Sequence, residues 1–303
     1  MNPNNMTMLH SFMNKYTPLI EQELLRIFPS EWVIPDKLTQ SIRYSLLSGG
    51  KRLRPLLVIA AAESVGGSSE SVLPVACAIE LVHTYSLIHD DLPAMDNDDY
   101  RRGKLTNHKV YGEDMAILAG DGLLTHAFYL IAQGARRHGI QADVVLDIVE
   151  DLSVYAGVRG MVGGQVADML GEQGETDLDQ LTYIHVHKTS DLLVCSLLAG
   201  ARCAGANDDQ LSALRRYGEA IGLAYQIQDD ILDVIGDEEK IGKRTNSDEK
   251  QSKVTYPYFI GVEASQARVK ELTEAGKQAL TEGDLADPSL LLAMADYLLA
   301  RDR

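Results

Sequence analysis

The chain has 303 residues, of which 45% are hydrophobic and 6% aromatic, and its formal net charge at pH 7 is -16. This hydrophobic share is enough for a sizeable core. The negative charge opposes phosphate backbones, so a protein that binds nucleic acid is not expected. Small phosphates can still bind where basic residues converge or where carboxylates hold metal ions.

The cysteines and apolar runs limit the class of protein further. Cys77, Cys195 and Cys203 form no CxxC pair, and their odd number argues against a disulfide framework or a structural zinc site. The first sixteen residues, MNPNNMTMLHSFMNKY, lack a basic flank followed by an apolar stretch, so we expect no secretory signal. The apolar run LLVCSLLAGA (192–201) is too short to cross a bilayer. We therefore expect a soluble cytoplasmic protein without stable membrane insertion.

Helical periodicity recurs along the chain. The stretch SVLPVACAIELVHTYSLIHDD (71–91) is apolar on nearly all sides, which predicts a buried central helix. In residues 211–236 the apolar positions recur every three or four residues, and no alternating strand pattern is evident. Breaks rich in Gly, Pro and polar residues are too short for domain linkers. The sequence predicts a single all-α domain spanning residues 1–303. The breaks lie at 28–32, 65–71, 171–179, 205–209 and 236–253.

A first acidic cluster follows the predicted central helix. The stretch HDDLPAMDNDDYRRGK (89–104) places five aspartates between positions 90 and 99 and then three basic residues. Asp91 and Asp96 would lie about 140° apart around a helix axis. Pro93 also removes a helical hydrogen bond. We therefore predict that the helix ends or bulges just after Asp91, so that Asp96 returns beside Asp90 and forms a multi-carboxylate site.

A second acidic cluster, QDDILD (228–233), lies within the other long helical pattern. Asp229 and Asp233 are four residues apart and share a helix face, where two like charges destabilise the helix unless a cation lies between them. The flanking residues are apolar, so a purely solvated run of charge is a poor account. Carboxylate oxygens are the ligands that Mg²⁺ prefers. The two clusters together favour metal binding.

Other sites fit the sequence less well. An EF-hand loop beginning at Asp96 would have Arg101 and Asn107 where glycine and glutamate are needed. The stretch SGGKRLRP (48–55) lacks the spacing and the hydroxyl residue of a phosphate-binding P-loop. Two histidine questions stay open at this stage. His83 could be a satisfied core histidine, and His185 with His187 could form a metal pair or have packing roles.

Seven motifs, spread over essentially the whole chain in one order, resemble those of the trans-isoprenyl diphosphate synthases, and most closely the bacterial farnesyl diphosphate synthases. They are GGKRLRP (49–55), DDLPAMD (90–96), RRG (101–103), GGQVAD (163–168), KT (188–189), YQIQDDILD (225–233), and GKR with SKVTYP (242–257).

The resemblance implies an isoprenoid-synthase-type helical bundle around a central cavity, usually a homodimer. It implies an enzyme that joins an allylic diphosphate to isopentenyl diphosphate, with three Mg²⁺ ions per active site. The implied metal ligands are Asp90, Asp91, Asp96, Asp229, Asp230 and Asp233. The implied catalytic residues are Lys188, Thr189, Gln226, Arg101 and Lys243. The implied isopentenyl diphosphate site consists of Gly50, Lys51, Arg54, His83 and Arg102, in which forked guanidinium groups suit phosphate oxygens.

The length of the product depends on the depth of the cavity. Tyr85 and Ser86 precede Asp90 by five and four residues, or about 6 to 7.5 Å along a helix. A bulky residue there would form a floor, and Tyr85 beside Ser86 resembles the bacterial farnesyl pattern. We expect (2E,6E)-farnesyl diphosphate, made by condensing isopentenyl diphosphate with dimethylallyl and geranyl diphosphate.

Several alternatives stay open. A geranylgeranyl diphosphate synthase would share the same chemistry. A terpene cyclase or head-to-head synthase would not need both aspartate clusters together with GGKRLRP, and a non-catalytic helical subunit would not need to keep both clusters. The roles of Tyr225, Gln165, Asp168 and the C-terminal Arg303 are undetermined at this stage.

Overall fold

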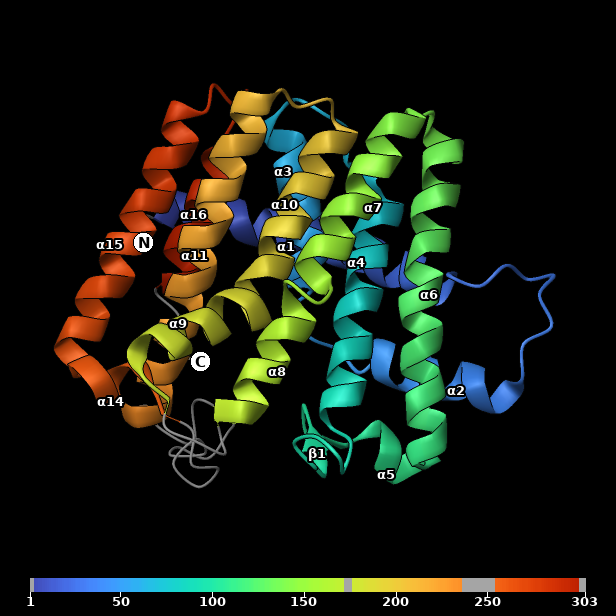
Figure 1. Ribbon diagram of the computed structural model, residues 1–303. Helices are drawn as coiled ribbons and strands as arrows, with labels where there is room; N and C mark the ends of the chain where they lie inside the picture. Colours follow the sequence, from blue (N-terminus) through green and yellow to red (C-terminus); the bar gives the residue numbers. More distant parts are fainter. Residues whose placement is uncertain (1–2, 172–175, 236–253, 300–303) are drawn as a thin grey trace.

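The computed structural model describes residues 3–171, 176–235 and 254–299, and helices make up nearly all of its regular structure (Figure 1). The helices are α1 (Pro3–Leu25), α2 (Asp36–Leu46), α3 (Leu53–Ser64), α4 (Ser69–Asp90), α5 (Asn107–Tyr111), α6 (Glu113–His138), α7 (Ala142–Ala156), α8 (Met161–Gly171), α9 (Leu178–Ile184), α10 (Asp191–Cys203), α11 (Asp208–Ile235), α14 (Tyr256–Ile260), α15 (Val262–Glu282) and α16 (Ser289–Leu299). A π-helical turn, η1 (His185–Ser190), joins α9 to α10. The predicted all-α class is confirmed.

The predicted central helix is α4, which packs along α3, α6 and α10. Its first turn is capped by Ser68, whose hydroxyl accepts a hydrogen bond from the backbone N–H of Glu70 at 3.3 Å. Both α4 and α6 are long and apolar enough to cross a membrane, but 72% of the apolar window of α4 is buried inside the protein. α4 is therefore a core helix, as its all-round apolar pattern predicts.

The other long periodic pattern forms α11, which packs between α10 and α15. α4 and α11 both run to the lower part of the molecule in Figure 1, where α4 ends beside the hairpin that contains β1 and α11 ends near α9 and α14. The two acidic clusters are therefore carried to the same end of the bundle. The largest hydrophobic core runs from Leu9 in α1 to Leu298 in α16 and supports both helices.

A small hairpin is an exception to the helical prediction. β1 (Tyr100–Arg101) pairs antiparallel with β2 (Lys104–Leu105) through a two-residue loop. Arg102 and Gly103 in that loop have positive φ values of 53° and 74°. Such values match the right-handed twist of a hairpin, and the glycine adopts them without steric cost.

The three cysteines are free, and two of them are fully buried. Burial raises the pKa of Cys77 and Cys195 well above the usual range and that of Cys203 to about 12. At neutral pH all three thiols are therefore protonated. Protonated cysteines of this kind are inert and act as small packing residues.

Candidate active site

The first acidic cluster begins where α4 ends. The helix stops at Asp90, and the chain then curls so that the backbone N–H of Asp96 donates to the carbonyl oxygen of Asp90 at 2.9 Å. The backbone N–H of Asn97 donates to Leu92 and closes the turn. The predicted return of Asp96 to the end of the helix is confirmed.

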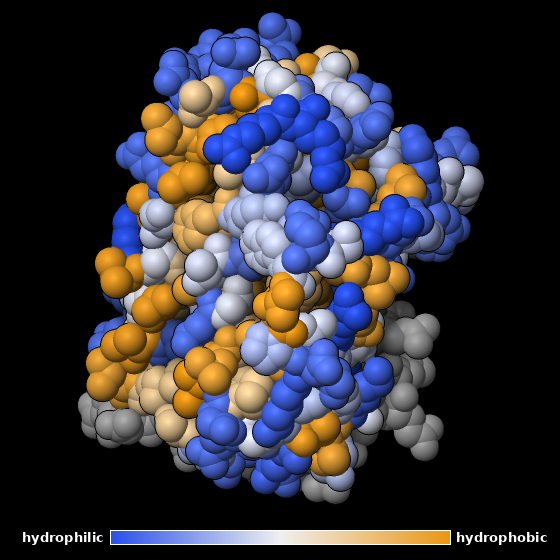
Figure 2. All heavy atoms as spheres, turned by 90° about the vertical axis from the view of Figure 1, so that its right-hand side faces the viewer, coloured by the Kyte–Doolittle hydropathy of each residue, from blue (hydrophilic) through white to orange (hydrophobic). Residues whose placement is uncertain are grey.

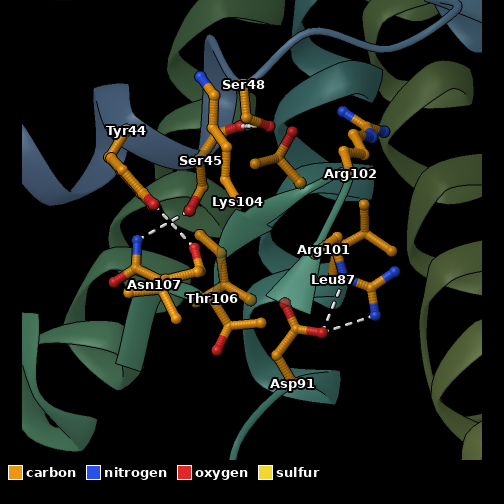
Figure 3. Close-up of a pocket in the computed structure, with 13 residues that line it drawn as sticks. Tyr44, Ser45, Ser48, Leu87, Asp91, Arg101, Arg102, Lys104, Thr106 and Asn107 are labelled. Atoms are coloured by element: carbon orange, nitrogen blue, oxygen red, sulfur yellow. Dashed lines mark hydrogen bonds and ion pairs between the residues drawn. The ribbon is translucent and has the colours of Figure 1, made fainter. Parts of the chain in front are cut away.

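Arg101 holds the second aspartate of this cluster (Figure 3). Its Nε and Nη2 lie 2.7 and 2.6 Å from Oδ1 of Asp91, whereas Oδ2 of Asp90 is 3.9 Å from Nη2. Asp91 is buried. Burial raises the pKa of Asp91 and the bond to Arg101 opposes that rise. The carboxylate of Asp91 is therefore bound by Arg101. The side chain of Gln165 donates a hydrogen bond to Oδ1 of Asp90.

A small pocket lies on the Asp91 side of this cluster, between α2, α4 and the hairpin (Figure 3). Arg101, Arg102 and Lys104 line it, together with Ser48 and Asn107. Positive charge therefore gathers beside the acidic cluster, as the adjacency of the two runs in the sequence predicts.

The GGKRLRP segment forms a sharp turn before α3. Gly49 and Gly50 have φ values of 85° and 122°, which side chains rarely allow. A Cβ atom on Gly50 would lie 2.6 Å from Nη1 of Arg102, and the same guanidinium donates to the carbonyl oxygen of Gly49. The two glycines therefore let Arg102 pack against the turn that carries Lys51 and Arg54.

His83 lies in α4 near these cations. Burial lowers the pKa of His83 well below its usual range, and the positive charges of Arg54 and Arg102 lower it further. The imidazole is therefore neutral at pH 7. A neutral imidazole can donate one hydrogen bond without adding another charge.

The depressed pKa makes the stability of the fold depend on acidity. Below about pH 6.5 the unfolded chain takes up a proton at His83, whereas the folded chain does not. The free energy of unfolding therefore falls as the pH falls, by at most about 1.4 kcal/mol per pH unit for this one group. We expect His83→Gln to flatten the dependence of the free energy of unfolding on pH between about pH 7.5 and 5.5. Urea titrations measure this, with the exposed His10→Gln as control. Identical slopes in wild type and His83→Gln would contradict the burial of a neutral imidazole.

Lys188 and Thr189 lie in the π-helical turn η1. Lys188 Nζ is 2.6 Å from Oδ2 of Asp168 in α8. A Cβ atom on Gly164 would collide with the backbone N of Lys188, so only glycine allows α8 to approach η1 so closely. π-helical turns occur frequently at functional sites. α8 thus contacts both parts of the site, through Gln165 to Asp90 and through Asp168 to Lys188.

The middle aspartate of the second cluster is built into the fold. Asp230 is buried, and its Oδ2 accepts a hydrogen bond from the backbone N–H of Tyr256 and lies 2.9 Å from His185 Nε2. Asp229 is exposed and Asp233 is half-buried on the same helix. Asp230 therefore connects α11, η1 and the start of α14.

The two histidines of YIHVHK have separate carboxylate partners. His187 Nδ1 lies 2.7 Å from Asp191 Oδ2, and His185 pairs with Asp230. These contacts agree with the packing roles considered for the two histidines.

The remaining predicted residues are placed as follows. Gln226 on α11 and Thr189 on η1 are half-buried, and the two elements pack against each other. Tyr225 borders a small apolar pocket with Ile221 and Val269. Lys243 and Arg303 lie outside the described residues.

Magnesium fits the donor set at this end of the bundle. Among the described residues, no group of three or more His, Cys, Asp or Glu side chains forms a closed metal site. Mg²⁺ is usually held by only one or two carboxylates, with substrate phosphates and water completing the octahedron. Two separate carboxylate clusters at one end of a bundle are suited to that mode, in which the substrate completes the site.

Comparison with known proteins identifies the family. The polyprenyl synthetase family matches residues 35–287 of the chain. The chain belongs to this family. Its members transfer prenyl groups between diphosphate substrates, and the chain is accordingly a prenyltransferase.

Similar proteins carry more than one product name. The chain is 46% identical to a farnesyl diphosphate synthase from Geobacillus stearothermophilus, over 97% of this chain and 98% of that protein. It is 48% identical to a geranylgeranyl diphosphate synthase from Cyanophora paradoxa, over 88% of this chain and 89% of that protein. The solved structure of an FPP/GFPP synthase from Zymomonas mobilis superposes with a TM-score of 0.83 at 32% identity, covering 99% of this chain and 100% of that one. The predicted fold and the resemblance to bacterial farnesyl diphosphate synthases are confirmed.

Sequence reasoning missed two buried charged residues near the site, Arg52 and Glu80. Arg52 lies inside the motif GGKRLRP, but nothing in the motif distinguishes it from its neighbours. Glu80 could have been recognised from the sequence, because it is an isolated charge within an otherwise apolar helix face. A charge in such a position is rarely buried without a partner.

Proposed function

We propose that this prenyltransferase is a farnesyl diphosphate synthase. It would condense isopentenyl diphosphate with dimethylallyl and then geranyl diphosphate to give (2E,6E)-farnesyl diphosphate. The product assignment rests on Tyr85, which lies on α4 five residues before Asp90. Its side chain is buried, and the centroid of its ring is 5.7 Å from that of the His89 ring. A geranylgeranyl diphosphate synthase is the second candidate, favoured by relatives of that name at similar identity.

The aspartate clusters would bind the allylic diphosphate through magnesium. Bound Mg²⁺, three ions by family resemblance, would neutralise the charge of the leaving diphosphate. We assign the metal ligands to the six aspartates of the two clusters, Asp90, Asp91, Asp96, Asp229, Asp230 and Asp233. The contacts of Asp91 with Arg101, and of Asp230 with His185 and the backbone N–H of Tyr256, would orient those two carboxylates.

The chain's own cations would assist the departure of the diphosphate. Arg101, Lys188 and Lys243 would stabilise the negative charge that develops on the leaving group. The double bond of isopentenyl diphosphate then attacks the allylic cation, and a proton is lost to the released diphosphate. Thr189 and Gln226 would direct oxygen dipoles toward the cation without trapping it. No protein nucleophile is required.

The second substrate must be bound without metal, because otherwise its own diphosphate would be activated to leave. Lys51, Arg54 and Arg102 supply positive charge around the turn at Gly50, and His83 supplies a neutral donor. Fixed guanidinium groups suit the bidentate binding of phosphate oxygens.

The proposal is tested by the products of the purified enzyme. The protein is incubated with Mg²⁺, dimethylallyl diphosphate and labelled isopentenyl diphosphate, and the alcohols are identified after phosphatase treatment. Farnesol as the main product supports the proposal. Geranylgeraniol favours the second candidate, and no incorporation by folded protein contradicts both.

Removing the proposed floor is expected to lengthen the product. Tyr85→Ala deletes a buried ring one to two turns from Asp90, so the chain can grow past that level, and geranylgeraniol or longer alcohols should replace farnesol. Tyr85→Phe keeps the ring and is the matched control, for which farnesol should persist. Product analysis by chromatography measures the ratio. Unchanged products from Tyr85→Ala would refute the floor.

We further propose a cytoplasmic homodimer of single-domain subunits that span residues 1–303. Only 44% of the apolar window of α6 is buried, and Ile117, Leu118 and Phe128 on it are exposed. Figure 2 faces the side of the molecule on which α6 lies, and hydrophobic side chains gather there in patches. A second copy is the partner that would cover this helix. Sedimentation velocity tests the assembly, and a monomer at micromolar concentration would contradict it.

A further inference from the structure

A buried ion pair joins Arg52, a residue of the GGKRLRP turn, to Glu80 on α4. Arg52 Nη1 is 2.8 Å from Glu80 Oε1, and the two side chains are 1% and 4% exposed. Arg52 Nη2 also donates to the carbonyl oxygen of Leu46 at 2.9 Å. A third group, Oε1 of Glu21, is 3.8 Å from the same Nη2, but the Glu21 side chain is 47% exposed.

The stability of the fold does not by itself explain why this ion pair is present. Removing two charges from water costs several kcal/mol per ion, and well-packed apolar residues often do as well or better. Arg52 also adopts a left-handed backbone conformation, with φ of 50°, and its Nε is a buried donor without a hydrogen-bond partner in the described part of the chain. Both features add cost. The pair is therefore expected to have another role.

The position of the pair indicates that role. Arg52 stands between Lys51 and Arg54 and immediately precedes α3, while its bond to Leu46 fixes the turn to the last residue of α2. Glu80 lies on α4, three residues before His83, so it is one helical turn away along the same side of the helix. The pair thus joins the turn to the helix that carries His83.

Glu80 also balances the surrounding positive charge. Burial lowers the pKa of Arg54 and of Arg102, and the negative charge of Glu80 opposes both shifts. These guanidinium groups repel one another when no diphosphate is bound. The buried carboxylate of Glu80 reduces that repulsion.

We propose that Arg52 and Glu80 are positioning residues that hold Lys51, Arg54, Arg102 and His83 in place for the diphosphate of the metal-independent substrate. The inference rests on the proposed function, because that function assigns these four residues to isopentenyl diphosphate. Arg52 and Glu80 themselves are not expected to touch the substrate.

The test measures substrate affinity without turnover. Isopentenyl diphosphate is titrated calorimetrically into the full-length protein without Mg²⁺ or allylic substrate. Glu80→Gln keeps the shape of the side chain and removes its charge. We expect about tenfold weaker binding, the lower end of the loss seen when the hydrogen-bonded partner of a metal ligand is removed. Glu21→Gln is the matched control, because it removes an exposed carboxylate near the same guanidinium, and its affinity should equal that of wild type.

Steady-state kinetics give a second measurement. In Glu80→Gln the KM for isopentenyl diphosphate should rise, while the KM for dimethylallyl diphosphate should stay at the wild-type value. If Glu80→Gln does not fold, Arg52→Lys replaces it, since lysine keeps the charge and loses the fork that reaches both Glu80 and Leu46. Wild-type affinity for isopentenyl diphosphate in whichever of these two variants is used would overturn the proposal.

A double variant separates positioning from stability. Arg52→Met with Glu80→Leu replaces the pair by apolar side chains and should recover the melting temperature lost in Glu80→Gln. The proposal expects affinity to stay low; recovery of affinity together with stability would overturn it.

The proposed function has its own control in Lys51→Gln and Arg54→Gln. If both bind isopentenyl diphosphate like wild type, the assignment of the turn is wrong, whatever Glu80→Gln does.

Discussion

Asp90→Ala is expected to lower kcat by about 10³-fold, the scale of removing one group that stabilises developing charge in a transition state. Asp90 ends α4, accepts a hydrogen bond from Gln165, and has Asp96 folded back onto its carbonyl group. In the proposed function its carboxylate would hold magnesium at the leaving diphosphate. Incorporation of labelled isopentenyl diphosphate at saturating Mg²⁺ measures kcat. Calorimetric titration of Mg²⁺ in the presence of inorganic pyrophosphate measures metal binding apart from turnover.

The matched control for this variant lies in the same acidic cluster. Asp99 is exposed and pairs with Lys109 at 2.7 Å. Asp99→Ala removes the same charge from the cluster and should keep both kcat and metal binding near the wild-type values. Equal losses in the two variants would mean that the net charge of the cluster matters and that no particular carboxylate does.

The parts of the site that were predictable from sequence depend on local geometry. The helical period sets the angle between Asp91 and Asp96, and Pro93 cannot continue a hydrogen-bonded helix, so the turn after α4 follows from a few neighbouring residues. The buried state of α4 follows in the same way from apolar residues on all its sides. The hairpin at Arg102 and Gly103 was missed because its strands have only two residues each, too few to show an alternating pattern.

The partners within the site were not predictable, because they join residues far apart in the chain. His185 and Asp230 are separated by 45 positions, and Arg52 and Glu80 by 28. Periodicity shows that a helix has a buried face, but it does not show which charge on another helix meets it. A run of aspartates also looks uniform in sequence, although Asp230 is buried against protein donors while Asp229 is exposed.

Lys188→Met should lower kcat by about 10²- to 10³-fold, because it removes a cation from the proposed leaving-group site. Lys109→Met, which deletes an exposed lysine with a carboxylate partner, is the control and should leave kcat unchanged. Asp168→Asn should have a smaller effect, since asparagine can still accept a hydrogen bond from Lys188 Nζ.

The double variant decides how Asp168 acts. Asp168 lies 2.6 Å from Lys188, and α8 approaches η1 closely only because position 164 is glycine. If Asp168 serves to orient Lys188, adding Asp168→Asn to Lys188→Met should cause no further loss of kcat, because residues that act as a unit are not additive. A full additional loss in the double variant would mean that Asp168 reaches the substrate or its metal independently of Lys188.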